Sequence, residues 1–176
     1  ADVRKKLITA EACIHHLWFC DTDYSNKGNW IKWNPAIKSA ADRDALQKAL
    51  HTHQIDVIAT DHAPHTREEK LQTYEKAPSG GPLVQHSLQA LIELSKQGVI
   101  NLETIAQKAA HNVAQLFCIE DRGYIREGYF ADLVLVNLHS GQPVTSASLW
   151  AQCGWSPFEN TTFSSTITHT FVNGYL

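Results

Sequence analysis

Apolar positions in the first part of the chain fall into short continuous runs and stretches with helical spacing. A dense run of apolar and β-branched residues at 7–19 predicts a buried strand that leads into a loop. A second run at 55–60 lacks the two-residue alternation of a half-exposed strand, which favours a parallel strand buried on both faces. Between them, residues 39–51 carry apolar side chains on one helical face, and Ser39 and Asp42 have the spacing of a helix N-terminal cap.

Two further helices are expected after the second strand. Residues 83–97 predict the clearer one, because Gly98 suits the position just beyond a helix C-terminus. A second helical pattern covers 102–117, with an expected break near His111 and Asn112. The apolar stripe of the first helix consists of Val84, Leu88, Leu91, Ile92 and Ser95.

The loop between the second strand and these helices, residues 61–82, is rich in proline and glycine. Thr66 and Glu69 have the spacing of a capping box, so a short helix is expected there. From Gly123 onward the pattern becomes typical of short strands joined by glycine turns. We expect strands at 124–125, 131–138 and 161–175, with turns at Gly128, Gly141 and Gly174.

The order strand, helix, strand, loop, helix is typical of βα units in a parallel barrel. A complete βα barrel needs about 250 residues, so this chain can supply at most half of one. We therefore predict an α/β fold class, the C-terminal portion of a TIM-like (β/α)8 barrel. We divide the chain into residues 1–118, the barrel part, and residues 119–176, a small β segment.

Composition narrows the class of protein. The 176 residues are 43% hydrophobic and 19% charged, which is typical of a folded globular chain. A net charge of -3 gives no basic surface for nucleic acid, and no apolar run approaches the roughly 20 residues that cross a membrane. The four cysteines lack CxxC spacing, which favours reduced thiols and a cytoplasmic location. Because the chain starts at Ala1 and contains no methionine, we interpret it as a piece of a longer protein.

The sharpest chemical feature is the segment TDHAPH at 60–65. Asp61 follows an apolar run, so it should stand at the carboxyl end of a strand, where barrel enzymes build their active sites. A carboxylate there can bind a divalent metal ion and accept a proton from a metal-activated water. Asp61 can equally cap the following turn, and spacing alone leaves both interpretations open.

Several segments, in this order, resemble class I dihydroorotases of the amidohydrolase superfamily. IDVIATDHAPHTREEK at 55–70, followed by EKAPSGGP at 75–82, is similar to the end of that family's barrel. The resemblance covers nearly the whole chain. Its other segments are TAEACIHHLWF (9–19), WNPAIKSAADRDAL (33–46), REGYFADLVLVNL (126–138) and GWSPFEN (154–160).

The resemblance implies a metallo-hydrolase of pyrimidine biosynthesis. Such enzymes reversibly hydrolyse dihydroorotate to N-carbamoyl-aspartate with one or two zinc ions. Asp61 would be the last metal ligand, and it would take a proton from the attacking water and pass it to the leaving nitrogen. Asn34 and His65 would hold the substrate, and the loop at Ser79 and Gly80 would offer it backbone N–H groups. Residues 119–176 would form part of a composite β-sandwich.

The chain departs from the family pattern at four positions. Ile14 stands where the family usually has a proline before its histidine pair. Ala36 and Lys38 replace a second proline and an arginine, and Lys38 keeps the charge without the bidentate fork. Ser79 replaces a more usual aromatic residue. These departures weaken the expected substrate contacts at positions 38 and 79.

The family's other metal ligands lie upstream of the segment that matches. They are a His-x-His pair, a bridging lysine or aspartate, and two later histidines. His51 and His53 have the letters of that pair, but they lie at a helix end, and we do not expect them to bind metal. We therefore expect as partners the missing N-terminal half of the parent chain and further copies in a homo-oligomer, and we expect the piece alone to be inactive. Half a barrel would also expose strand edges and apolar surface, which favours association.

Most other polar and aromatic residues have simpler interpretations. His15 and His16 are expected to pack or to support the site from behind. Glu11 is expected to be a satisfied core carboxylate, and His86 and His111 are expected at the surface or an interface. The five tryptophans are expected to pack in the interior.

Two rival functions stay open. The first is another cyclic amidase, such as a hydantoinase, dihydropyrimidinase or allantoinase. Asn34, His65 and the loop at Ser79 and Gly80 argue against it, because they suit a ring carboxylate that hydantoins lack. The second is a non-catalytic dihydroorotase-like subunit. The presence of Asp61 together with Asn34 and His65 argues against that reading, because a scaffold has no need of them.

Overall fold

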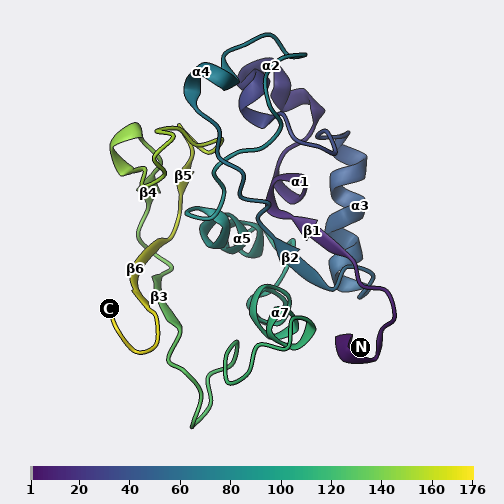
Figure 1. The fold of residues 1–176 in the computed structure, drawn as a ribbon, viewed down its shortest axis with the longest axis vertical. Helices are drawn as coiled ribbons and strands as arrows, with labels where there is room; N and C mark the ends of the chain where they lie inside the picture. The colour runs from purple at the N-terminus through teal and green to yellow at the C-terminus, as the bar shows by residue number, and fades with distance from the viewer. Residues whose placement is uncertain (1) are drawn as a thin grey trace.

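The computed structural model describes residues 2–176 and is built around two short parallel strands. Strand β1 (Glu11–Cys13) pairs with β2 (Val57–Ala59), so that Cys13 lies opposite Ala59. Helix α3 (Ala40–His51) lies on one side of the pair, and α5 (Ser87–Lys96) lies on the other (Figure 1). This arrangement is the βα order that the sequence predicts, and it brings the carboxyl ends of both strands to the same edge.

The remaining helices are short. Helix α1 (Ile14–Trp18) follows β1 directly, and α6 (Leu102–Ala106) continues into α7 (Asn112–Leu116). The others are η1 (Val3–Lys5), η2 (Asp21–Asp23), α2 (Tyr24–Lys27), η3 (Gly28–Ile31), α4 (Arg67–Lys70), η4 (Gln107–His111) and η5 (Ser146–Ser148). None of the helices in residues 2–176 has the length and apolar character needed to cross a membrane.

The predicted helix caps are confirmed. The Ser39 hydroxyl accepts a hydrogen bond from the Asp42 amide at 3.3 Å, and the Asp42 carboxylate accepts one from the Ser39 amide at 3.1 Å. Thr66 and Glu69 form the same reciprocal pair at the start of α4. These contacts satisfy backbone donors that the first turn of a helix leaves free. Gly98 has a φ of +77°, as expected beyond the end of α5.

Other predicted boundaries were wrong. Residues 14–18 form a helix rather than a continuation of the strand, because a short apolar run does not distinguish the two. Helix α5 begins at Ser87 rather than at residue 83, and Val84 is 63% exposed. Residues 83–86 form a turn instead, in which the Leu83 carbonyl accepts from the amides of His86 and Ser87, while the amides of Leu83 and Val84 donate to the His62 ring. The expected break near His111 is a π-helical turn, η4, that keeps the helix continuous.

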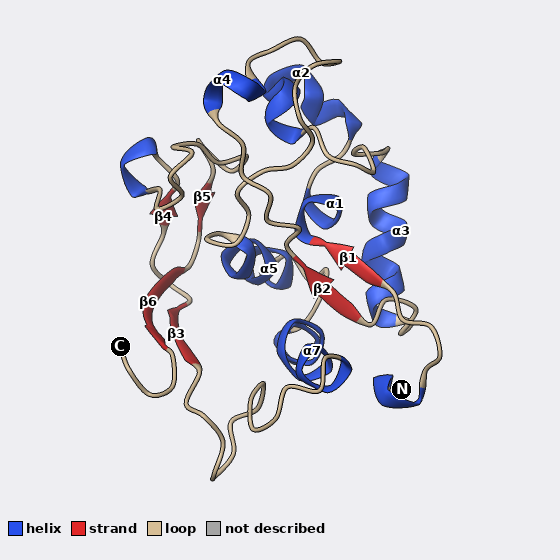
Figure 2. Cartoon of the chain, in the orientation of Figure 1, coloured by secondary structure: helices blue, strands red, loops and turns tan. Residues whose placement is uncertain are grey.

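The C-terminal segment is largely β structure. Strand β3 (Leu133–Asn137) pairs antiparallel with β6 (Thr166–Phe171), and β4 (Gln142–Pro143) pairs with β5 (Thr162–Phe163). Figure 2 shows these strands on the opposite side of α5 from the β1–β2 pair. The strand expected at 124–125 does not form, because Tyr124 instead stacks on the His111 ring at 4.1 Å. Gly128 and Gly174 have positive φ values, as their turns require.

The core is shared between the two segments. Ile14 and Leu17 of α1 are fully buried, and they join one cluster with Phe158 and Phe163 of the C-terminal segment. Trp33 and Trp155 are buried as expected, whereas Trp150 is 89% exposed. Trp150 is thus a correction to the expectation that all five tryptophans pack.

Candidate functional site

Asp61 lies just beyond the carboxyl end of β2, beside the carboxyl end of β1. Its φ of +47° is a left-handed conformation that Asp tolerates better than most residues. The side chain is exposed, and its carboxylate makes no hydrogen bond within residues 2–176. The alternative reading of Asp61 as a cap for the next turn therefore has no hydrogen bond to support it, and the carboxylate is available to a ligand.

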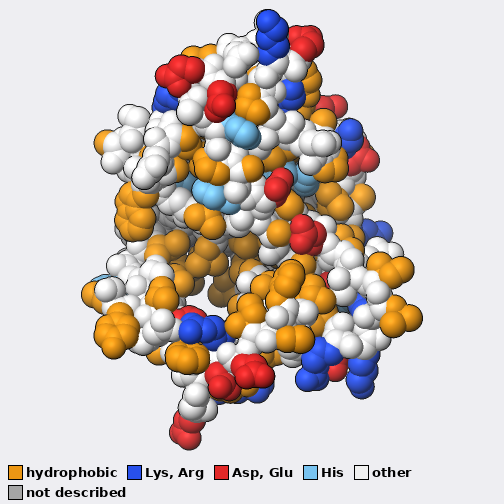
Figure 3. Space-filling view, viewed as in Figure 1, with side chains coloured by type: hydrophobic (Ala, Val, Ile, Leu, Met, Phe, Trp, Pro, Cys, Tyr) orange, Lys and Arg blue, Asp and Glu red, His pale blue; other side chains and the backbone are white. Residues whose placement is uncertain are grey.

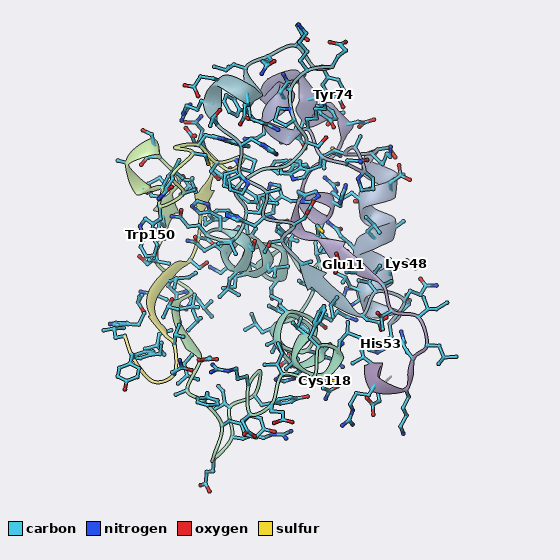
Figure 4. The ribbon with its side chains drawn as sticks, in the orientation of Figure 1. Glu11, Lys48, His53, Tyr74, Cys118 and Trp150 are labelled. Atoms are coloured by element: carbon cyan, nitrogen blue, oxygen red, sulfur yellow. The ribbon has the colours of Figure 1, made fainter. Side chains whose placement is uncertain are left out.

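Cys13 and Glu11 of β1 lie near Asp61, and the pKa of Cys13 reports burial and the negative charge there. Burial raises the pKa of the Cys13 thiol to about 11, and the negative charges of Asp61 and Glu11 add to the effect. The thiol therefore stays protonated at neutral pH and is a poor nucleophile. Glu11 is exposed, which corrects the expectation of a satisfied core carboxylate, because nothing in the described chain covers that face of β1. Figure 4 shows Glu11 on β1, at the sheet.

His65 joins the segment after β2 to the loop at Ser79. Its Nε2 donates to the Ser79 carbonyl at 3.0 Å, and its Nδ1 lies 3.9 Å from the Glu69 carboxylate. The Trp155 indole donates to the His65 carbonyl at 2.7 Å, which fixes the backbone. The structure therefore brings together two of the residues that the sequence assigns to substrate binding.

Gly80 passes directly against the segment that carries Asp61. A side-chain carbon at Gly80 would lie 2.7 Å from the Ala63 carbonyl oxygen, and its φ of +122° also favours glycine. The Gly80 amide donates to the Lys32 carbonyl at 2.9 Å. This N–H is therefore engaged within the protein, which corrects the expectation that it points to the substrate. The Ser79 amide has no acceptor within residues 2–176.

Asn34 lies in the loop after the buried Trp33. Its side chain is exposed, and its carboxamide makes no hydrogen bond within the described chain. The next residue is held in place, because His16 Nε2 donates to the Pro35 carbonyl at 2.9 Å. Asn34 thus has a fixed backbone and a free polar side chain, although no contact joins it to Asp61.

His15 is buried behind this loop and stacks on the Trp33 ring at 4.4 Å. Burial lowers the pKa of His15 to about 3, and the charge of His16 adds to the effect. Neither ring nitrogen of His15 has a partner within residues 2–176. His15 is therefore a neutral packing group, as expected. His86, expected at the surface or an interface, is also buried and is 4% exposed, so its place at the surface is corrected.

Lys70 of α4 lies against the loop at Ser79 and Gly80, and the sequence pattern does not indicate it as a functional residue. Only 1% of Lys70 is exposed, and its ammonium group donates to the Gly80 carbonyl at 2.9 Å. The pattern of α4 gave no signal of this, because its neighbours Glu68 and Glu69 are exposed.

Asp61 is the described residue best placed to bind a metal ion. The free carboxylate of Asp61 is a suitable zinc ligand, but zinc takes four ligands as a rule. Within residues 2–176 no group of three or more His, Cys, Asp or Glu side chains lies close enough together to hold a metal ion. His51 and His53 lie at the end of α3, and Figure 4 shows His53 beside the N-terminal segment, away from the loop that carries Tyr74. In Figure 3, histidine and acidic side chains gather on one face above an apolar hollow.

Comparisons with known proteins identify the family of the chain. Residues 9–176 match the amidohydrolase family. A dihydroorotase of Halobacterium salinarum is 39% identical over 151 residues, which are 86% of this chain and 36% of that protein. A dihydroorotase of Pyrococcus furiosus is 31% identical over 173 residues, which are 98% of this chain and 40% of that protein. The chain therefore spans well under half the length of these relatives.

Solved structures show the same fold. The L-hydantoinase (dihydropyrimidinase) of Arthrobacter aurescens has a TM-score of 0.88 at 23% identity, over 94% of this chain and 38% of that one. The dihydropyrimidinase of Brevibacillus agri has a TM-score of 0.84 at 22% identity, over 95% of this chain and 38% of that one. At this level of identity the likeness establishes the architecture and leaves the substrate open.

Proposed function

The chain belongs to the amidohydrolase family, and from this premise we propose that it is part of a zinc-dependent dihydroorotase. The whole enzyme would reversibly hydrolyse dihydroorotate to N-carbamoyl-aspartate in pyrimidine biosynthesis. The observation that carries the proposal is the free carboxylate of Asp61 at the common carboxyl edge of β1 and β2. Relatives named dihydroorotase, 31 to 39% identical over most of the chain, support this substrate over other cyclic amides.

Asp61 would act on protons in both halves of the reaction. Zinc, when bound, polarises the ring carbonyl and makes water a better nucleophile at neutral pH. As the new C–O bond forms, Asp61 accepts a proton from the attacking water. As the ring C–N bond breaks, Asp61 returns that proton to the leaving nitrogen. One carboxylate in both roles leaves the protein's own protonation unchanged after each turnover.

The ring carboxylate of the substrate would lie against Asn34 and the loop at Ser79 and Gly80. The Asn34 carboxamide and the Ser79 amide are donors without acceptors in the described chain, so both are available to an anion. His65 lies beside this loop, and its Nε2 donates to the Ser79 carbonyl. We propose that His65 also contacts the substrate. For this, either its Nδ1 must move away from the Glu69 carboxylate or its Nε2 must give up the hydrogen bond to the Ser79 carbonyl.

The remaining zinc ligands would come from a part of the enzyme outside residues 1–176. Asp61 alone cannot hold the ion tightly, and the chain covers only 36% of the Halobacterium salinarum dihydroorotase and 40% of the Pyrococcus furiosus one. We propose that an N-terminal half of the parent chain supplies them, that the whole enzyme is a cytoplasmic homo-oligomer, and that residues 1–176 are inactive alone.

The test compares Asp61→Asn with Asp121→Asn in the full-length, zinc-loaded enzyme. Asp121 is a matched control, because it is also exposed and also has a positive φ, of 54° against 47°. Asn keeps the shape and tolerates the backbone, so only the carboxylate is lost. We expect D61N to lower kcat for dihydroorotate by about a thousandfold, the usual range for a lost proton-transfer group, and D121N to leave it unchanged. Equal activity of D61N and wild type would refute the role of Asp61.

A further inference from the structure

Lys70 presents a buried positive charge that the proposed reaction does not use. Its Nζ donates to the Gly80 carbonyl at 2.9 Å, to the Pro78 carbonyl at 3.0 Å and to the Lys32 carbonyl at 3.4 Å. The ring of Trp155 covers it at 5.5 Å. No acidic side chain pairs with it in the described chain, so carbonyl dipoles and one aromatic face solvate this ammonium group.

Such a burial is unfavourable unless the charge is well solvated. Burial lowers the pKa of Lys70 to about 8, and the nearby charge of Lys32 adds to the effect. At pH 7 the group therefore keeps its proton and all three donors. A lysine that meets three carbonyls and no acid is suited to fixing the backbone that provides those carbonyls.

That backbone is the loop of the proposed substrate site. Lys70 holds the carbonyls of Pro78 and Gly80, and His65 holds the carbonyl of Ser79 between them. In a trans peptide the N–H points away from the C=O, so the Pro78 contact turns the Ser79 amide away from the ammonium group. Lys70 thus fixes the direction of the Ser79 N–H group, which is the donor that the loop can offer to a substrate.

The same loop cannot move without affecting the segment after β2. Gly80 lies so close to Ala63 that a methyl group does not fit between them. Ala63 is two residues from Asp61, and its amide donates to the Gly81 carbonyl at 3.2 Å. A second lysine, Lys32, holds the start of the loop through the carbonyls of Ala77, at 2.6 Å, and Tyr74.

We propose that Lys70 is a positioning residue, which fixes residues 78–81 so that the Ser79 amide faces the substrate beside Asp61. The inference rests on the proposed function, because it takes this loop to be part of the substrate site. Lys70 itself does not touch the substrate. Its loss should therefore weaken substrate binding and leave the proton transfers at Asp61 largely intact.

The first experiment measures kcat and KM for dihydroorotate in the full-length enzyme carrying Lys70→Met. Lys27→Met is the control, because Lys27 also donates to backbone carbonyls, those of Pro157 at 2.6 Å and Glu159 at 3.5 Å, and contacts no part of the 78–81 loop. We expect K70M to raise KM about tenfold or more with kcat within about threefold, and K27M to change neither beyond about twofold. A wild-type KM in folded K70M, or equal effects of the two variants, would overturn the proposal.

Gly80→Ala displaces the loop while Lys70 remains, so it should reproduce the KM defect, and it carries the test if K70M does not fold. An unchanged KM in G80A would also count against the loop's role. Hydrogen exchange of residues 77–83 provides a measurement that does not depend on activity. Faster exchange in K70M than in K27M would support the positioning role of Lys70. Failure of the wild-type enzyme to hydrolyse dihydroorotate is a separate outcome, and it would refute the proposed function without touching the exchange result. Equal exchange in the two variants would refute the positioning role.

Discussion

His86 illustrates how a single buried residue links packing to pH. Its ring lies 6.0 Å from Phe158 and 6.1 Å from Phe163, and its Nδ1 has one weak contact, to the Ser156 hydroxyl at 3.4 Å. Burial lowers the pKa of His86 to about 4. The folded protein thus keeps His86 neutral over a range in which an unfolded chain protonates it.

This difference predicts a loss of stability in mild acid. Above the unfolded pKa of about 6.5 the His86 contribution is complete, and it is lost as the pH falls from there toward about 4. Over that window each pH unit lowers the free energy of unfolding by up to about 1.4 kcal/mol for this residue. We expect His86→Phe to reduce the dependence of the unfolding free energy on pH, measured in urea between about pH 6 and 4.5. The reduction should correspond to up to about one proton fewer taken up on unfolding. Exposed His139→Phe is the control, and a slope in H86F equal to that of wild type would contradict the prediction.

The sequence alone predicts the position of some residues in the fold but not the burial of others. Asp61 could be predicted, because an apolar run followed by Asp places a carboxylate at a strand end whatever the rest of the chain does. The burial of His86 and Lys70 could not be predicted. His86 is buried by Phe158 and Lys70 by Trp155, partners more than 70 residues away in the chain, and local patterns carry no information about such contacts.

At the scale of elements, local chemistry decided which predictions succeeded. Helices α3 and α4 begin where their capping boxes lie, because a cap is made by residues three apart. Helix α1 was missed because its apolar residues, Ile14 and Leu17, pack with distant aromatic residues that the sequence does not connect to it. The turn before α5 is joined to a distant residue, because the amides of Leu83 and Val84 donate to the His62 ring. Tertiary contacts thus override local propensity at α1.

The whole molecule has the architecture of part of an amidohydrolase barrel, and its sheet is incomplete in the described chain. Strands β1 and β2 have only each other as partners within residues 2–176. A cavity of about 560 Å³ lies between α5 and the β3–β6 pair, and its wall includes Leu88, Val134 and the exposed Trp150. Open strand edges and apolar cavities of this kind are usually covered by further chain.

We therefore expect residues 1–176, when produced alone, to self-associate and to bind a hydrophobic dye. Production together with the rest of the parent enzyme should suppress both effects, because the added chain covers the same edges and cavity. Sedimentation velocity and dye fluorescence measure the two effects directly. A clean monomer of residues 1–176 with no dye binding would contradict the expectation.

The most direct test of the proposed function compares two substrates of the full-length, zinc-loaded enzyme. Dihydroorotate and dihydrouracil share a ring and differ in the carboxylate that Asn34 and the loop at Ser79 and Gly80 are proposed to receive. A site with donors for that group should favour dihydroorotate in kcat/KM by about a hundredfold or more. Equal rates, or a preference for dihydrouracil or hydantoin, would contradict the account and assign the chain to the cyclic amidases whose fold it shares.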